Sequence, residues 1–325
     1  MSLDLSALLD DSKPARLLIE ASLIPVQGKR FQPTGFPDLG AAVFDTKDGT
    51  RLIVESHQSM ANRLEAVCWD HANRSLVSEL QGLSHVLVND SDGNYLTSTI
   101  TEAHRLNSPY ILESKDRRFF EQFRKETEVL EKGRLDRAKL AAILFKYDVG
   151  SLLHGIFLAK KELVGGRLRI ERALSAFIEA EGARVAASGG VKNDHVDPKG
   201  GDKTEKGAKE GFGNVPFQRD EYTADRIVAY FNLDLVEVRG FGLGKDAEAL
   251  LIALALYKIR AFIEGNLRLR TACDFEVDGE LRVRRPAGFA VPSFAGLRKE
   301  MPRLIAKCAR AFAGERGATT VTYKA

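Results

Sequence analysis

The sequence predicts an α+β fold in which two helices cover one side of a mainly antiparallel sheet. Strand-like segments recur along the chain, first as a continuous apolar run over residues 15–26. Helical spacing of apolar side chains begins at His57 and again at Asp246. The chain of 325 residues contains no internal repeat. We therefore expect a single elaborated domain spanning residues 1–325.

The first strands and the first helix lie within the first 70 residues. Residues 15–26 (ARLLIEASLIPV) are rich enough in Leu, Ile and Val to predict a central strand that is buried on both faces. After a loop rich in glycine and proline, residues 41–44 and 51–55 flank an Asp-Gly pair, which favours a β-hairpin. The helix expected from His57 has a polar face formed by Gln58, Ser59, Asn62 and Arg63.

The middle of the chain gives weaker patterns. Short strands are expected over residues 85–89 and 95–101, and helices over residues 116–131 and 136–146. The apolar segments 151–160 and 167–180 fit a strand and a helix about equally well, and we favour a strand for the second segment.

Residues 186–221 differ in composition from everything around them. Seven glycines and five lysines occur in these 36 positions, with few large apolar side chains. Such a segment cannot build its own core, and it lies between two strongly apolar segments. We therefore predict a long, flexible insertion that projects from a folded domain, and not a linker between two domains.

The chain after the insertion alternates between strand and helix patterns. Residues 226–239 predict a strand, which the glycine-rich string 240–244 ends. Residues 246–263 predict a helix that is apolar on most of its circumference and therefore buried, with Asp246 as its N-cap.

The basic C-terminal region begins with a further strand. Residues 267–277 alternate as one strand, with Arg268 and Arg270 on its polar face. Residues 293–313 predict a helix that Pro302 interrupts. Residues 258–325 hold 14 Lys and Arg against 7 Asp and Glu, although the whole chain carries only +3. A basic segment is typical of surfaces that bind phosphate polymers, and also of a solvated helix.

Composition excludes several classes of protein. Hydrophobic residues at 44% and charged residues at 29% argue against wholesale disorder and against a disulfide scaffold. Cys68, Cys273 and Cys308 have no metal-binding spacing, which favours the reducing cytoplasm. The N-terminal residues lack the pattern of a signal peptide, and no apolar run is long enough to span a membrane. We expect a soluble cytoplasmic protein that does not bind a membrane.

No motif in the sequence requires an enzymatic reaction. The six histidines form no metal-binding pattern, and the acidic cluster around His195 lies among glycine and lysine, as expected of a solvated tip. His154 lies in an apolar run and reads as a core residue rather than a catalytic base. The string Gly240 to Gly244 has three residues where a phosphate-binding P-loop needs four, so tight packing is favoured. We expect no metal and no cofactor.

The loop Gly28 to Gly35 is the most informative short segment. It places two cations, an aromatic ring and two hydrogen-bonding side chains directly after a core strand. These residue types are suited to holding a phosphate backbone and stacking a base. A rigid hairpin edge with Phe31 turned inward fits the same residues equally well.

Several strings in order resemble one known family. They include GKRFQPTGFPDLGAAVF, VESHQSMANRLE, SLLHGIFL, RALSAFIEA, VPFQRDEYTA, AYFNLDL and ALYKIRAFIEGNLRLRTACDFE. Together these strings resemble the backbone subunit of the type I-G (formerly I-U) CRISPR Cascade interference complex, a branch of the RAMP superfamily. The resemblance covers about residues 15–278, and the chain beyond residue 285 matches nothing distinctive.

The resemblance implies a non-catalytic protein with an RNA-recognition-motif-like (RRM-like) palm. Such subunits polymerise along the CRISPR RNA and present it for pairing with target DNA. They also contact the other Cascade subunits, namely the large subunit and the repeat-processing or end-cap subunit. Residues 186–221 resemble the projecting thumb hairpin of these subunits, and the string Gly240 to Gly244 resembles their glycine-rich loop.

The residues expected to bind RNA are polar, cationic or aromatic, with the exception of the aliphatic Val215, and lie in six stretches of the sequence. They are Lys29, Arg30, Phe31, Gln32, Thr34, Gln58, Ser59, Asn62, Arg63, Arg167, Arg169, Lys192, Val215, Phe217, Arg219, Arg268 and Arg270. Val215 or Phe217 would be a wedge beside a displaced base. The alternative function is a RAMP-type endoribonuclease that processes repeat RNA, with His57 or His154 beside a Lys or Tyr in one cleft.

Overall fold

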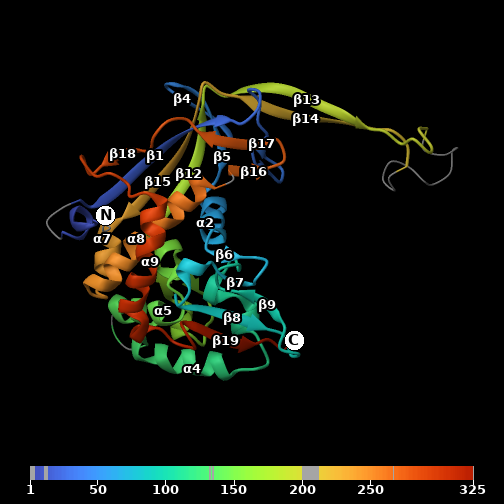
Figure 1. Ribbon diagram of the computed structural model, residues 1–325. Coiled ribbons are helices and arrows are strands. Elements are labelled where there is room, and N and C mark those ends of the chain that lie inside the picture. Colours follow the sequence, from blue (N-terminus) through green and yellow to red (C-terminus); the bar gives the residue numbers. More distant parts are fainter. Residues whose placement is uncertain are drawn as a thin grey trace.

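The computed structural model describes residues 4–10, 14–131, 133, 135–199, 212–265 and 267–324. Its main feature is an eight-stranded antiparallel sheet in the order β16–β17–β1–β15–β12–β5–β4, with β18 also paired to β1 (Figure 1). The strands are β1 (Arg16–Pro25), β4 (Val43–Thr46), β5 (Gly49–Glu55), β12 (Leu174–Glu181), β15 (Arg226–Asp234), β16 (Leu267–Arg270), β17 (Cys273–Val277) and β18 (Arg282–Arg285). The predicted α+β class, the central position of the first strand and the hairpin before residue 55 are confirmed.

Two helices cover the inner face of this sheet. They are α2 (His57–Ala66), which packs on β12, and α8 (Lys245–Glu264), which packs on β15. Along β1 buried residues such as Ile19 and Leu23 alternate with half-exposed ones such as Glu20, so only the inner face is fully covered. The expectation that this strand is buried on both faces is therefore wrong.

A second lobe lies on the far side of the helices from the sheet (Figure 1). It contains a three-stranded sheet in which the C-terminal strand β19 (Ala318–Thr322) runs parallel to β8 (His85–Asn89), and β9 (Tyr95–Ser98) pairs with β8. The remaining elements of this lobe are β6 (Trp69–Asp70), β7 (Ser75–Leu76), α3 (Pro109–Leu112), α4 (Arg118–Thr127), α5 (Arg137–Tyr147), α6 (Gly150–His154), β10 (Ile156–Leu158) and β11 (Leu168–Ile170). The segment 151–160 is thus part helix and part strand, because Gly155 turns the chain at a φ of 77°.

Residues after 226 depart from the predicted pattern in three places. The strand expected to reach residue 239 ends at Asp234, whose carboxylate accepts a hydrogen bond from the Glu237 N–H and caps α7 (Leu235–Gly240). The strand expected over residues 267–277 is a hairpin, β16 and β17, with Ala272 at a φ of 57° in its turn. Helix α8 begins at Lys245 after Gly244, so Asp246 lies in the first turn and is not the N-cap.

The last long helix, α9 (Phe294–Cys308), packs against α8 and continues past Pro302 without interruption. Short elements complete the fold: α1 (Ser6–Leu9), β2 (Gly35–Phe36) and β3 (Gly40–Ala41). No helix among the described residues is both long enough and apolar enough to cross a membrane.

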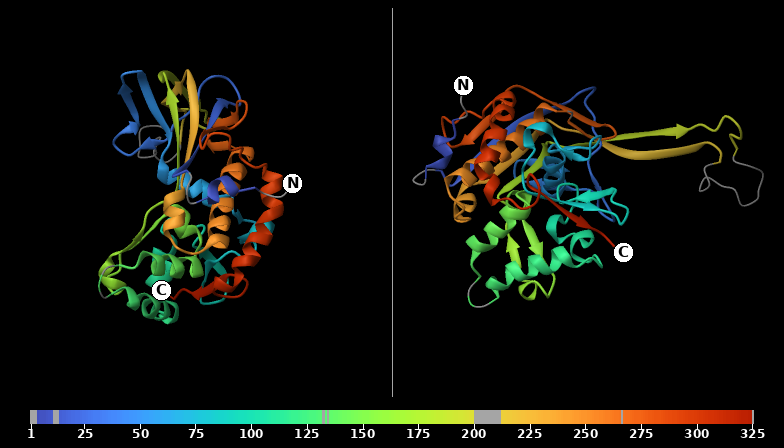
Figure 2. Two further views of the ribbon diagram at one scale, coloured as in Figure 1. Left: turned by 90° about the vertical axis from the view of Figure 1, so that its left-hand side faces the viewer. Right: turned by 60° about the horizontal axis from the view of Figure 1, so that its bottom comes forward.

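A two-stranded arm projects from the body of the molecule (Figure 2). It consists of β13 (Arg184–Lys192) and β14 (Val215–Thr223), which pair antiparallel from Arg184 opposite Thr223 to Lys192 opposite Val215. The arm continues strands β12 and β15 of the main sheet. The arm includes the described part of the insertion expected over residues 186–221; residues 200–211 of it lie outside the described residues, and the insertion and its flexibility stay a prediction.

Candidate nucleic-acid interface

Many of the predicted RNA-binding residues meet at one place, which we call the arm root. It consists of the loop of residues 26–34, the base of β14, the β16–β17 hairpin and the start of α2. Phe31 ties the loop to the arm, because its backbone N–H and C=O both form hydrogen bonds of 2.9 Å with the backbone of Tyr222. Residues that are far apart in sequence are thereby brought together.

A buried carboxylate organises the inner part of the arm root. Glu55 is fully buried at the end of β5 and accepts hydrogen bonds from Ser59, Arg63 and Arg270. Arg270 also donates to the Gln32 carbonyl at 3.1 Å and to the Thr34 hydroxyl at 2.8 Å. Arg63 donates to the Leu269 carbonyl at 2.6 Å. These arginines therefore join β16 to β5, and the sheet is curled so that the two strands approach each other.

A second carboxylate organises the outer part of the arm root. Glu221 is 5% exposed and is paired with Arg30 at 3.4 Å and with the Arg219 Nε at 3.0 Å. Beside this pair lies a hollow of about 440 Å³, lined by residues 26–30, Glu221, Ala272 and Asp274. Lys29 is exposed on the rim of the hollow, and Arg268 is exposed with its Nε 3.6 Å from Asp274.

The arm root keeps an excess of positive charge despite these carboxylates. Glu55 and Glu221 are each shared by two guanidinium groups, so each cluster retains one net positive charge. Exposed Lys29 adds a further charge. A surface of this kind attracts a phosphate backbone, and its contacts carry no base preference.

Aromatic residues at the arm root do not all lie as expected. Phe31 is 1% exposed and packs on Phe275 with ring centroids 5.6 Å apart, so the expectation that Phe31 stacks on a base is wrong. Its apolar ring fills the core beneath the loop. Phe217 is 44% exposed on the arm, and its ring lies over Gly190, where an added Cβ would be 3.1 Å from the ring and would require the ring to shift slightly. Val215 lies on the same face of the arm, opposite exposed Lys192.

Lys192, Val215 and Phe217 lie on the arm itself, and four further predicted residues lie outside both the arm and the arm root. Gln58 and Asn62 are exposed on α2 and bonded to each other at 3.1 Å. Arg169 is exposed on β11. Arg167 donates to the backbone carbonyls of Val164 and Glu131, so it fastens a loop. Sequence reasoning missed Glu55 and Glu221, because nothing in their local sequence indicates that each would meet two arginines.

The remaining sequence candidates are His154, the glycine-rich string and the acidic cluster around His195. His154 is buried with its Nε2 2.8 Å from the Lys258 Nζ, and burial together with this cation holds the pKa of His154 well below its ordinary value. Gly242 and Gly244 have positive φ angles in the turn before α8, at the opposite end of β15 from the arm. Asp194 accepts three backbone N–H groups near the arm tip, and no group of three metal-ligating side chains occurs among the described residues.

Comparison with known proteins identifies the family. A chain of the "CRISPR RNA-guided surveillance complex, pre-nicking" is 15% identical, with 91% of this chain and 87% of that chain covered and a TM-score of 0.42. Csc2 of Thermofilum pendens is 10% identical, with 94% and 81% covered and a TM-score of 0.32. Among curated proteins, none matches the sequence. Residues 17–185, just over half of the chain, match the family CRISPR-associated protein GSU0053 (Cas_GSU0053), and the chain therefore belongs to that family.

Proposed function

We propose that this protein is a CRISPR RNA-binding backbone subunit of a Cascade-type effector complex, of type I-G (formerly I-U). Several copies bind along one guide RNA and present it for pairing with target DNA. The observation that carries the proposal is the excess of positive charge at the arm root, in a chain of a CRISPR-associated family. No reaction is required for this role.

The topology of the main sheet supports an RRM-like palm. Strands β17, β1, β15 and β12 are neighbours in that order, α2 precedes β12 in the chain, and α8 follows β15. This order is the one expected of the β-α-β-β-α-β arrangement of ferredoxin-like folds, with the β4–β5 hairpin inserted before α2. In the chain, the arm lies between β12 and β15, the second and third strands of this arrangement.

The arm root contacts the guide through its backbone in this proposal. Lys29, Arg30 and Arg268 are exposed and hold phosphates, while Arg63 and Arg270 position the loop through Glu55. The arm acts as the thumb, with Phe217 against a displaced base. Partners are further copies of the chain, the large subunit and the repeat-processing or end-cap subunit. The buried, unpaired cysteines suit the cytoplasm as the site of assembly.

An endoribonuclease that processes repeat RNA is the second candidate. One observation favours it, namely the contact between His154 and Lys258 at 2.8 Å. Both side chains are buried, however. The Lys258 ammonium also donates a hydrogen bond to Nε2 of His154, so this nitrogen is not free to accept a proton from RNA. Incubating the purified protein with repeat RNA distinguishes the candidates, because a processing enzyme releases a discrete cleavage product and a backbone subunit leaves the RNA intact.

Binding measurements test the arm root directly. The double variant K29A/R30A should bind single-stranded RNA more weakly, and the slope of log K against log salt should fall by about 1.4, since about two fewer counterions are released. The control R282A/R284A removes two exposed arginines on β18, outside the arm root, and should bind like the wild type. Equal binding by both variants and the wild type would rule out the arm root as the RNA site.

Assembly provides the second test. When the protein is expressed with its partner subunits and a guide, it should be the most abundant chain in the complex. Native mass spectrometry should find several copies per guide, and a single copy would contradict the backbone role.

A further inference from the structure

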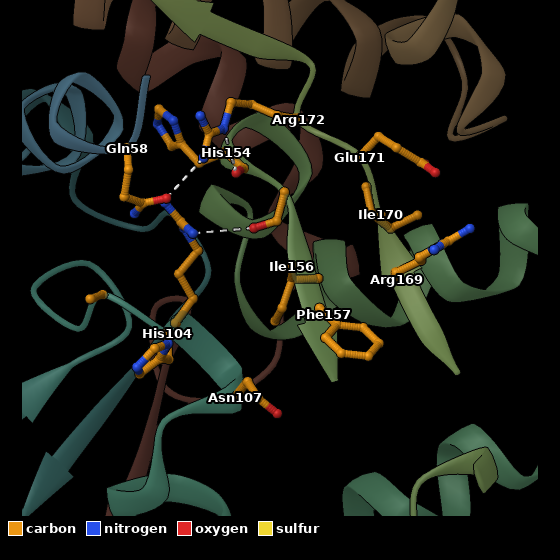
Figure 3. A pocket seen from close by; sticks show the side chains of 13 residues that line it. Gln58, His104, Asn107, His154, Ile156, Phe157, Arg169, Ile170, Glu171 and Arg172 are labelled. Atoms are coloured by element: carbon orange, nitrogen blue, oxygen red, sulfur yellow. Dashed lines mark hydrogen bonds between the residues drawn. The ribbon is translucent and has the colours of Figure 1, made fainter. Parts of the chain in front are cut away.

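A second hollow lies between the main sheet and the second lobe, apart from the arm root (Figure 3). Its volume is about 540 Å³, and its wall combines Gln58 of α2, the segment 103–107, the turn from α6 into β10, and residues 169–172. Helix α2 connects the two places, because Ser59 and Arg63 face the arm root while Gln58 lines this hollow.

One side of the hollow presents an aromatic ring beside a cation. Phe157 on β10 and Arg169 on β11 are directly opposite each other in the antiparallel pair, so their side chains lie on the same face of the hairpin. Phe157 is 55% exposed, and Arg169 makes no hydrogen bond or ion pair within the described part of the chain. The neighbouring pair, Ile156 and Ile170, is buried and holds the hairpin in place.

The other side of the hollow holds a second cation without a carboxylate. Arg172 donates to the His154 carbonyl at 3.2 Å and to the Gln58 side chain at 3.0 Å (Figure 3). No carboxylate among the described residues lies within ion-pair distance of Arg172. Glu171 also lines the hollow, and it shares Arg137 with Glu237, so these three side chains keep one net negative charge.

The deeper groups add a hydrogen-bond donor and no negative charge. Arg105 is neutralised by Glu65, with two hydrogen bonds of 2.6 Å. Since the Lys258 ammonium can only donate, His154 accepts at Nε2 and carries its proton on Nδ1, which has no partner among the described residues. The hollow therefore combines an exposed ring with two guanidinium groups, Arg169 and Arg172, that have no carboxylate partner among the described residues, and Glu171 is the carboxylate on its wall.

We propose that this hollow binds one nucleotide of a single-stranded RNA, with its base against Phe157 and its phosphate against Arg169, while Arg172 faces the strand from the other side of the hollow. The inference rests on the proposed function, and it adds a nucleotide-binding site that is separate from the arm root. A ring and guanidinium groups within one hollow match the two parts of a nucleotide, because bases stack on aromatic faces and guanidinium groups bind phosphate oxygens. The strand would pass from the arm root along α2 to this hollow.

The test uses the full chain, freed of nucleic acid, and a fluorescently labelled oligouridine of 12 nucleotides. R169A should weaken binding about fivefold at 0.1 M salt and lower the salt slope by about 0.7, because one phosphate contact is lost. F157L keeps an apolar side chain but removes the ring, so affinity should fall at least fivefold, whereas F157W should bind like the wild type. R282A is the matched control for the loss of one exposed arginine.

A crosslink gives a readout that a change in stability would not produce. Oligouridine carrying 5-iodouracil should crosslink on irradiation to the peptide that contains Phe157, and mass spectrometry identifies that peptide. Wild-type affinity in both R169A and F157L, or loss of affinity in R169A alone, overturns the nucleotide site. If K29A/R30A weakens binding in the same experiment, the proposed function stands without this hollow. If K29A/R30A also binds normally, the proposed function itself fails.

Discussion

Arg51 on the outer face of the sheet and the arginines of the arm root have opposite surroundings. On the outer face, Arg51 lies between Glu179 at 3.2 Å and Glu181 at 2.8 Å, so one cation meets two carboxylates. At the arm root the ratio is reversed, because Glu55 and Glu221 each meet two arginines. The difference teaches that the number of arginines in a segment does not identify a phosphate-binding surface. Whether a surface can bind phosphate depends on how many carboxylates from other segments pair with its arginines.

The largest expected effect comes from removing the buried carboxylate of the arm root. E55Q leaves Arg63 and Arg270 without their shared partner in a buried position, and losing one member of a buried ion pair costs about 3–5 kcal/mol of unfolding free energy. E179Q on the outer face should cost far less, because Arg51 keeps its second partner, Glu181, when Glu179 is lost. Urea denaturation of both variants measures the difference, and equal shifts of the midpoint would contradict the contrast between the two regions.

The local parts of the fold could be predicted from the sequence. The first strand, the hairpin before Glu55, helix α2 and the projecting arm each follow from patterns within a few residues. The strand expected over residues 267–277 failed because alternation continues across the turn at Ala272, and periodicity alone does not reveal a reversal of direction. The strand expected to reach residue 239 failed because the cap formed by Asp234 starts a helix that alternation hides.

For the candidate site, the sequence predicted which cationic residues take part, but not the carboxylates that they contact. The contact between Glu55 and Arg270 joins residues 215 positions apart, so no local pattern could indicate it. The loop residues fitted two interpretations equally, and burial of Phe31 selects the rigid hairpin edge for that ring. The sequence did not single out Phe157 or Arg172, because only the fold places them, with β10, β11 and α2, around one hollow.

The excess of positive charge continues beneath the second hollow, and this gives a pH prediction. Burial and the charges of Lys258, Arg105 and Arg172 hold the pKa of His154 well below 6.5, so this imidazole is neutral in the folded protein. Below pH 6.5 the unfolded chain binds a proton that the folded chain does not, and stability therefore falls on acidification. At pH 5.5 the loss from this residue amounts to about 1.4 kcal/mol relative to pH 7.5.

The variant H154Q removes the imidazole that titrates in the unfolded chain and keeps a polar side chain at this position. Urea denaturation at pH 7.5 and at pH 5.5 should give H154Q a smaller loss of stability than the wild type. His57 and His85 also have lowered pKa values through burial, and they remain in both proteins, so the difference isolates His154. Identical pH dependence in the two proteins would mean that His154 is protonated in the fold despite its surroundings.

The smallest effect is expected from a substitution that removes a carboxylate from the arm root and leaves all of its arginines and lysines in place. E221Q frees Arg30 and Arg219 from their shared carboxylate and raises the net charge there by one. Affinity for oligouridine should rise about fivefold at 0.1 M salt, with a salt slope steeper by about 0.7, because one more guanidinium group is available to a phosphate. E181Q makes the same change on the outer face, where Arg51 still has Glu179 and Arg226 still has Glu20, and it should leave RNA binding unaltered. If E181Q tightens binding as much as E221Q, net charge alone governs affinity, and the ratio of carboxylates to arginines at each surface has no part in it.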